Sequence, residues 1–138
     1  MKNTKVLARG TIVIALACGH FALTQPARAE TAITIDFDGT VGLGQGANAG
    51  QAIGEAIRNC QDNSSRIING CGARSLVSRG GWIVAERCGD RLTLQQGDTR
   101  AHAEHDVRNW KLGLKYYEGL SIDDCKRLVA VTPGGEAE

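Results

Sequence analysis

The sequence lacks the features that mark several common protein classes. It has no apolar run of about 20 residues, the length that a membrane-spanning helix needs, so we expect no stable membrane span. It has no Cys-x-x-Cys pair, and closely spaced pairs are what a structural zinc site requires. The net charge of the whole chain is only +1, which gives no indication of binding to nucleic acid or to an anionic membrane surface. The function must therefore be sought in local motifs.

Residues 1–29 have the pattern of a secretory signal peptide. Three basic residues lie among the first ten, an apolar stretch runs from Thr11 to Leu23, and Ala27-Arg28-Ala29 supplies the small residues that signal peptidase reads. We predict cleavage after Ala29. In an alternative interpretation, the stretch ending at Cys18 is a lipoprotein signal, and Cys18 would then carry a lipid anchor.

Residues 30–138 are expected to form one exported domain, periplasmic or secreted, because this length suits a single modest core. The leader takes four of the 16 basic residues, which leaves 12 against 15 acidic ones and a net charge of −3. An even number of cysteines in an exported chain usually means disulfides, and here two are predicted. The four cysteines are Cys60, Cys71, Cys88 and Cys125.

A faint internal repeat with an offset of 50 residues divides this domain into two halves. Each half reads as a short strand, a glycine turn, a second stretch, a helix and a closing strand, which indicates duplication within one fold. We therefore expect an α+β domain of two layers, in which two helices pack on one face of a largely antiparallel sheet. The matched residues include Ile33 with Ile83, Asp36 with Glu86, Gly39 with Gly89, and Asn48 with Asp98.

The helices and closing strands can be placed more closely. Asn48 and Asp98 are predicted N-caps, because their side-chain oxygens can accept from free amides of the first helical turn. The closing strands are predicted at Arg66–Asn69 and Arg127–Val131. The expected buried helix faces are Ala49, Ile53, Ala56, Ile57 and Cys60 in the first half, and Ala103, Val107, Trp110, Leu114 and Tyr117 in the second.

A hairpin is expected between the halves, with strands at Ala73–Val77 and Trp82–Glu86 around a turn centred on Arg79 and Gly80. This register places Cys71 opposite Cys88, within the range of a cross-strand disulfide. Elimination then pairs Cys60 with Cys125.

Several of these features together resemble a family of small exported bacterial domains of unknown function. They are an alanine-bearing helix that ends near a cysteine, the step Cys71-Gly72-Ala73, the Gly81-Trp82 strand and a second helix. The similarity covers most of residues 32–131. It departs from the pattern in the second helix, where Trp110 stands at the position of Cys60. The resemblance implies export and disulfides but no particular chemistry.

The sharpest catalytic motif lies at the end of the first predicted strand. Its Asp-x-Asp-Gly-Thr sequence resembles the first motif of haloacid-dehalogenase-type phosphatases, in which Asp36 would be the nucleophile and Asp38 the general acid/base. The partner motifs are missing, and Asp123-Asp124 precedes the last strand instead of following it. We expect a glycine turn here and keep a small metal-dependent phosphohydrolase as the alternative function.

Two further motifs predict binding only weakly. Gly42 to Ala49 contains versions of the dinucleotide-binding Gly-x-Gly-x-x-Gly/Ala fingerprint, but the domain is too short for two mononucleotide-binding halves. A flexible glycine loop is the expected meaning. His102, His105 and Asp106 have a helical spacing that could converge on a metal, and an exposed polar helix face is the simpler interpretation.

We expect a binding or interaction module that is not an enzyme and needs no cofactor or metal. Its partner is expected to be an envelope protein or glycan. The candidate partner surface consists of arginines, whose planar forks bind carboxylate or phosphate, although an ordinary solvated strand face is the alternative. The arginines proposed for it are Arg66, Arg74, Arg79 and Arg87.

Overall fold

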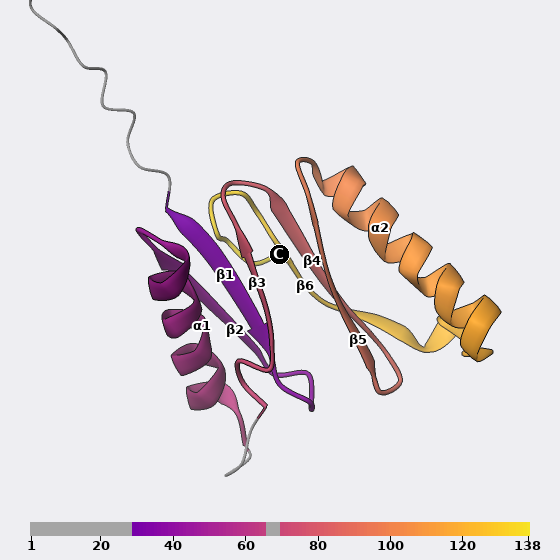
Figure 1. Ribbon diagram of the computed structural model, residues 1–138. Helices are drawn as coiled ribbons and strands as arrows, with labels where there is room; N and C mark the ends of the chain where they lie inside the picture. The colour runs from indigo at the N-terminus through magenta and orange to yellow at the C-terminus, as the bar shows by residue number, and fades with distance from the viewer. Residues whose placement is uncertain (1–28, 66–69) are drawn as a thin grey trace, which may run out of the picture.

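A computed structural model describes residues 29–65 and 70–138 and shows an α+β fold of two packed halves (Figure 1). The first half contains β1 (Glu30–Ile35), β2 (Val41–Gly46), α1 (Ala49–Asn63) and β3 (Arg74–Ser78). The second contains β4 (Trp82–Cys88), β5 (Arg91–Gly97), α2 (Arg100–Gly113) and β6 (Cys125–Val131), with the π-helical turn η1 (Leu114–Glu118) and the 3₁₀ turn η2 (Ile122–Asp124) before β6. Residues 1–28 of the predicted signal peptide, including Cys18, lie outside the described residues. So do Arg66 and the predicted strand Arg66–Asn69.

The two halves have the same topology, which agrees with the repeat in the sequence. Each forms an antiparallel three-stranded sheet with its first strand in the middle, in the orders β2-β1-β3 and β5-β4-β6. The α+β class, the antiparallel pairing, the two helices and the two disulfides are confirmed. The expected single sheet with both helices on one face is replaced by two sheets.

The sheets pack face to face, and the helices cover the two outer faces (Figure 1). Alternation along each strand explains this layering, because successive side chains point to opposite faces of a sheet. On β4, Ile83 and Ala85 join the core between the sheets, whereas Val84 packs against Ala103 and Val107 of α2. The core between the sheets holds Ile33, Ile35, Ile83, Ala85, Leu92, Val129 and Val131.

In the first half, α1 packs on β2 through side chains of minimal size. Ala52, Ala56 and Cys60 form the buried face of α1. Opposite them, the alternate residues Gly42 and Gly44 are buried in β2, where an added Cβ atom would overlap the helix backbone. The predicted flexible glycine loop is therefore part of a strand whose glycines allow the helix to approach the sheet closely.

The helix starts agree closely with the sequence pattern. The side chain of Asn48 accepts a hydrogen bond from the Gln51 amide at 3.0 Å, so the predicted cap of α1 is confirmed. The cap of α2 is Thr99, one residue after the predicted Asp98, and it accepts from the His102 amide. The predicted burial of Tyr117 is wrong, since this side chain is 91% exposed in η1.

The link between β3 and β4 is not a hairpin turn. Both strands exist near their predicted positions, but β3 pairs with β1 while both edges of β4 are occupied by β5 and β6. The link therefore crosses from one sheet to the other. Ser78 stabilises it, because its hydroxyl accepts from the Gly81 amide at 2.8 Å and donates to the Gly81 carbonyl at 3.1 Å.

The disulfide pairs predicted from that hairpin are wrong for the same reason. The bonds join Cys60 to Cys71 and Cys88 to Cys125. The first connects the end of α1 to the segment before β3, and the second connects the paired strands β4 and β6. Each half is therefore closed by its own disulfide, and neither bond connects the halves.

A group of ion pairs holds α2 to β6 and to the end of the chain. Glu104 accepts from Arg100 at 3.0 Å and from Arg127 of β6 at 2.9 Å, and Arg100 also binds Glu138 at 2.7 Å. The hydrogen bond from Arg100, supported by the charge of Arg127, lowers the pKa of the Glu104 carboxyl below its ordinary value. The last residues also pair with Ala130 through backbone hydrogen bonds, which cover the edge of β6.

Candidate functional site

Several charged side chains lie close together at one end of the two packed sheets, which we call the sandwich. There a hollow of about 620 Å³ lies beside the turns that follow β1 and β4 and beside η2. We call it the charged hollow. It is lined by Arg87, Gly89, Asp123, Asp124, Lys126 and Leu128.

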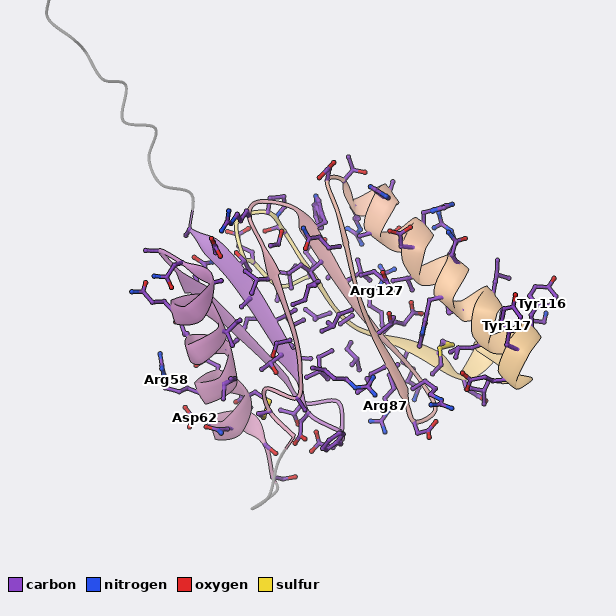
Figure 2. All side chains as sticks on the ribbon, viewed as in Figure 1. Arg58, Asp62, Arg87, Tyr116, Tyr117 and Arg127 are labelled. Carbon is purple, nitrogen blue, oxygen red and sulfur yellow. A yellow bond between two sulfur atoms is a disulfide. The ribbon has the colours of Figure 1, made fainter. Side chains whose placement is uncertain are left out.

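Two hydrogen bonds hold the Arg87 side chain in place at the edge of the charged hollow. Its Nη1 donates to the backbone carbonyl of Asp38 at 2.6 Å, and its Nε donates to the carbonyl of Gly89 at 2.7 Å. The side chain thus connects the turn after β1 to the turn after β4, and Figure 2 shows it at this end of the molecule. Its second amino group takes part in neither bond. Such a held guanidinium can present a donor to a ligand with little further loss of side-chain entropy.

The disulfide Cys88–Cys125 joins the two sides of the charged hollow. Arg87 and Gly89 flank Cys88, and Asp124 and Lys126 flank Cys125. The covalent bond therefore fixes Arg87 on one side relative to Asp124 and Lys126 on the other. Preorganisation of this kind is what a binding site on a small domain needs.

The remaining charged groups of the hollow are available to a ligand. Asp123, Asp124 and Lys126 are exposed, and their side chains make no hydrogen bond or ion pair with other residues in the described part of the chain. The hollow offers cationic donors and carboxylate acceptors side by side, and Leu128 adds an apolar contact. It can therefore satisfy a ligand that carries both hydrogen-bond donors and acceptors.

Asp36, the candidate nucleophile of the phosphatase-like motif, is completely buried. One carboxylate oxygen accepts from the amides of Phe37 at 2.6 Å and Gly70 at 2.5 Å, and the other accepts from the Ser64 hydroxyl at 3.0 Å. These bonds tie the end of β1 to the segments on either side of residues 66–69. In this arrangement the Asp36 carboxylate is engaged inside the protein and is not exposed to solvent.

Asp38, the candidate acid/base, shapes the turn between β1 and β2. Its side chain accepts from the Thr40 amide at 2.8 Å, as short polar side chains often do in turns. Its backbone carbonyl receives the bond from Arg87, so Asp38 lies next to the charged hollow. The two aspartates of the motif thus have different local roles.

Replacing Asp36 by asparagine tests the structural role. The amide retains one oxygen for the two backbone donors and can donate to the Ser64 hydroxyl, so only the charge assistance is lost. We expect Asp36→Asn to lower the free energy of unfolding by about 1–2 kcal/mol, measured by urea denaturation. A magnesium-dependent phosphatase activity that this substitution abolishes would contradict the assignment.

The predicted arginine surface is divided between the two ends of the sandwich. Arg79 lies at the end where β1 begins and pairs with Glu30 at 2.7 Å. Arg74 lies at the other end and donates to the Leu92 carbonyl at 2.8 Å, and Arg87 lines the charged hollow. All three side chains thus make internal contacts, and Arg87 is the member that combines them with the hollow.

The histidine motif remains an exposed face of α2. His102 and His105 both lie near Asp106, with nitrogen–oxygen distances of 3.7 and 3.4 Å. Across residues 29–65 and 70–138, no three His, Cys, Asp or Glu side chains are placed to hold a metal ion. The arrangement is that of local polar contacts on a helix surface.

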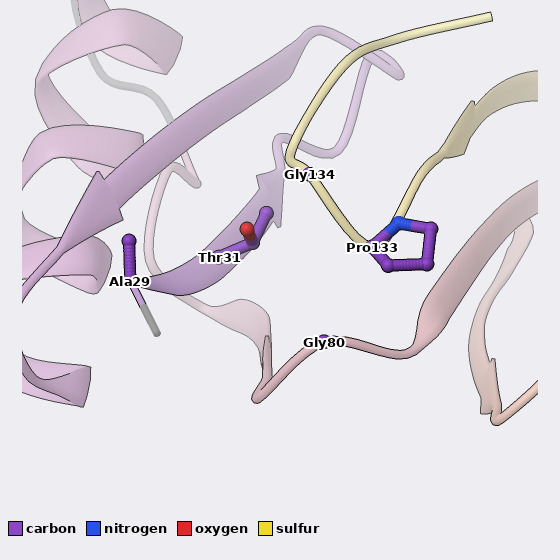
Figure 3. Close-up of a pocket in the computed structure, with 5 residues that line it drawn as sticks. All are labelled: Ala29, Thr31, Gly80, Pro133 and Gly134. Carbon is purple, nitrogen blue, oxygen red and sulfur yellow. The ribbon is translucent and has the colours of Figure 1, made fainter. Parts of the chain in front are cut away.

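A second hollow, of about 340 Å³, lies at the opposite end beside the β3–β4 link (Figure 3). Its lining residues are Ala29, Thr31, Gly80, Pro133 and Gly134. The Thr31 hydroxyl is the only polar side-chain group among these five residues. This hollow therefore offers a ligand fewer charged and hydrogen-bonding groups than the charged hollow does.

The sequence gives no indication of Lys126 as a site residue, and Asp123-Asp124 resembles only a misplaced catalytic pair. The pairing of Cys88 with Cys125 indicates these three residues, because it brings the neighbours of Cys125 beside the neighbours of Cys88. The predicted hairpin pairs Cys88 with Cys71 instead, so it does not place the neighbours of Cys125 beside those of Cys88.

Comparisons with known proteins identify no relative. No protein-family model matches the chain, and no curated protein or solved structure matches it either. The fold and the site together define a small, duplicated, disulfide-bonded α+β domain with a preorganised charged hollow. No helix in the described part of the chain is long and apolar enough to cross a membrane.

Proposed function

We propose that this chain is an exported binding module of the bacterial envelope that performs no catalysis and recognises a glycan through the charged hollow. Two disulfides are typical of proteins that leave the reducing cytosol, which supports the setting. The leader pattern of residues 1–29 supports export to the periplasm or beyond.

A difference in accessibility between two groups of side chains favours binding over catalysis. The carboxylate with a catalytic sequence context, Asp36, is buried and fully engaged, whereas Asp123, Asp124 and Lys126 are exposed in an open hollow. Groups that are accessible but lack a buried, water-excluded centre are suited to recognition rather than to stabilising a transition state.

The chemistry of the hollow favours a glycan as the ligand. Sugar hydroxyl groups both donate and accept, so they can bind the carboxylates of Asp123 and Asp124 together with the cations of Arg87 and Lys126. A sugar ring also has an apolar face that can cover Leu128. A carboxylate-bearing sugar would gain a charge-assisted bond from the free amino group of Arg87.

Calorimetric titration with soluble oligosaccharides tests this proposal. We expect uronic-acid-bearing oligomers to bind more tightly than neutral oligomers of the same length. Lys126→Gln and Asp124→Asn should each weaken binding about tenfold, the scale of one charge-assisted hydrogen bond. Arg58→Gln is the matched control, because Arg58 is exposed on α1, far from the hollow (Figure 2).

Three results would contradict the proposal. The first is equal binding by the two hollow variants and the unaltered protein. The second is binding of an envelope protein, but of no oligosaccharide, at the same residues. The third is magnesium-dependent phosphatase activity, which would favour the alternative of a small phosphohydrolase using Asp36 and Asp38.

A further inference from the structure

The largest exposed apolar side chains gather at the C-terminal end of α2. Four large apolar residues in the described part of the chain are strongly exposed, and three of them lie here: Leu112 at 45%, Tyr116 at 78% and Tyr117 at 91%. Figure 2 shows the two tyrosines beside each other, projecting from the end of α2 away from the sheets. Adjacent exposed aromatic side chains on a small domain indicate a contact surface.

The charges around these side chains are basic. The segment Val107–Tyr117 contains Arg108, Lys111 and Lys115 and no acidic residue. Glu86 balances the charge of Lys111 at 2.8 Å, whereas Arg108 and Lys115 form no ion pair within the described residues. The acidic residue that follows, Glu118, is itself bound by Arg91 at 2.7 Å. Within residues 107–118 the unbalanced charges, those of Arg108 and Lys115, are therefore positive. Asp123 and Asp124, which follow Ile122, line the charged hollow instead.

A separate hollow of about 300 Å³ combines both kinds of side chain. Two cations, Arg108 and Lys111, and two aliphatic residues, Leu112 and Ile122, line it. A phospholipid has the same combination, with an anionic phosphate next to the first carbons of its acyl chains. Tyrosines favour the headgroup layer of a membrane, where the ring is buried and the hydroxyl stays in water.

We infer that this end of α2, defined by Arg108, Leu112, Lys115, Tyr116, Tyr117 and Ile122, is a peripheral docking surface for anionic phospholipid membranes. Tyr116 and Tyr117 enter the headgroup layer, Arg108 and Lys115 bind anionic headgroups, and the hollow takes part of one lipid. The contact is shallow and reversible, because few apolar groups insert. The surface adjoins the charged hollow at η2 but shares no lining residue with it, so substitutions can test membrane docking and ligand binding separately.

Vesicle sedimentation tests the inference with the complete protein at low salt. The probes are vesicles of phosphatidylglycerol and phosphatidylcholine in equal amounts, and vesicles of phosphatidylcholine alone. We expect the partition coefficient for the anionic vesicles to be at least tenfold higher, and to fall as salt is raised. The double substitution Tyr116→Ser with Tyr117→Ser should lower it at least tenfold, and Lys115→Gln about fivefold.

Arg58→Gln provides the control, since it removes one exposed cation from the helix on the other side of the molecule (Figure 2). It should leave partitioning unchanged, and circular dichroism should show that every variant is folded. Equal partitioning onto the two kinds of vesicle would overturn the inference. So would partitioning that the tyrosine substitutions do not alter, or no partitioning at millimolar lipid, which would favour a protein as the occupant of this surface.

Discussion

Replacing Gly44 by alanine is expected to lower the free energy of unfolding by about 3 kcal/mol or more, which is at the upper end for overpacked sites. The added methyl group would overlap the Ala52 carbonyl oxygen and the Ala56 amide nitrogen of α1. Both atoms belong to the helix backbone, so no rotamer change can relieve the overlap. The helix must move away from β2, and this exposes the small-residue interface along its whole length. Urea denaturation followed by circular dichroism measures the loss.

Gly54 provides the matched control within the same packed unit. An added Cβ atom at this helical position would meet only the Arg58 side chain, at 3.6 Å. Alanine also restricts the unfolded chain more than glycine does, so Gly54→Ala should raise stability by about 0.5–1 kcal/mol. A Gly44→Ala protein as stable as the unaltered one would show that α1 does not lie directly on β2.

Removing the disulfide Cys88–Cys125 by double alanine substitution is expected to cost about 4 kcal/mol, the value of the chain-entropy model for its sequence separation of 37 residues. Removing Cys60–Cys71, with a separation of 11, should cost about 1 kcal/mol less. The first loss is a large part of the 5–15 kcal/mol of a typical domain. Thermal unfolding of the two double variants, compared with the unaltered protein, measures the difference.

Peptide mapping without reduction provides the control on connectivity. It should return Cys60 with Cys71 and Cys88 with Cys125. A map that joins Cys71 to Cys88 would restore the hairpin arrangement and contradict the two-sheet fold. If the two double variants lose equal stability, restriction of the unfolded chain does not determine how much each disulfide contributes to the free energy of unfolding.

The sequence predicts the local elements well because their signals are local. Asn48 caps α1 because its side-chain oxygen, directly before the helix that starts at Ala49, accepts from the free amide of Gln51 in the first turn. Strand β6 follows from a short β-branched and apolar run that contains Arg127–Val131. The repeat predicts two halves of the same order because duplicated sequences keep their hydrophobic alternation even when few residues remain identical.

The arrangement of the sheets could not be predicted from the same signals. A short glycine-containing link such as Arg79-Gly80-Gly81 suits a hairpin, but it also suits a crossing between two packed sheets. The choice depends on which strands occupy the edges of β4, and that pairing is a long-range property. The sequence predicts separate strands at Arg66–Asn69 and Ala73–Val77. The second corresponds to β3, and the first lies outside the described residues.

The candidate site was only partly predictable for a related reason. The Asp-x-Asp motif at Asp36 matches a catalytic motif in sequence. The structural role of Asp36 follows instead from its burial and from the hydrogen bonds that Phe37, Ser64 and Gly70 donate to it. Arg87 was proposed from its residue type and lies in the charged hollow. Lys126 carried no signal of its own, because its place depends on the disulfide between its neighbour Cys125 and Cys88.

The most direct test of the proposed function is an NMR titration of the protein with a uronic-acid-bearing oligosaccharide, followed through the backbone amides. The structure predicts saturable shifts confined to Gly89, Asp123, Asp124, Lys126 and Leu128, with α1 and the β3–β4 link unaffected. No shift at saturating oligosaccharide, or shifts centred on residues of the opposite end such as Thr31 and Gly134, would contradict the assignment of the charged hollow as the ligand site.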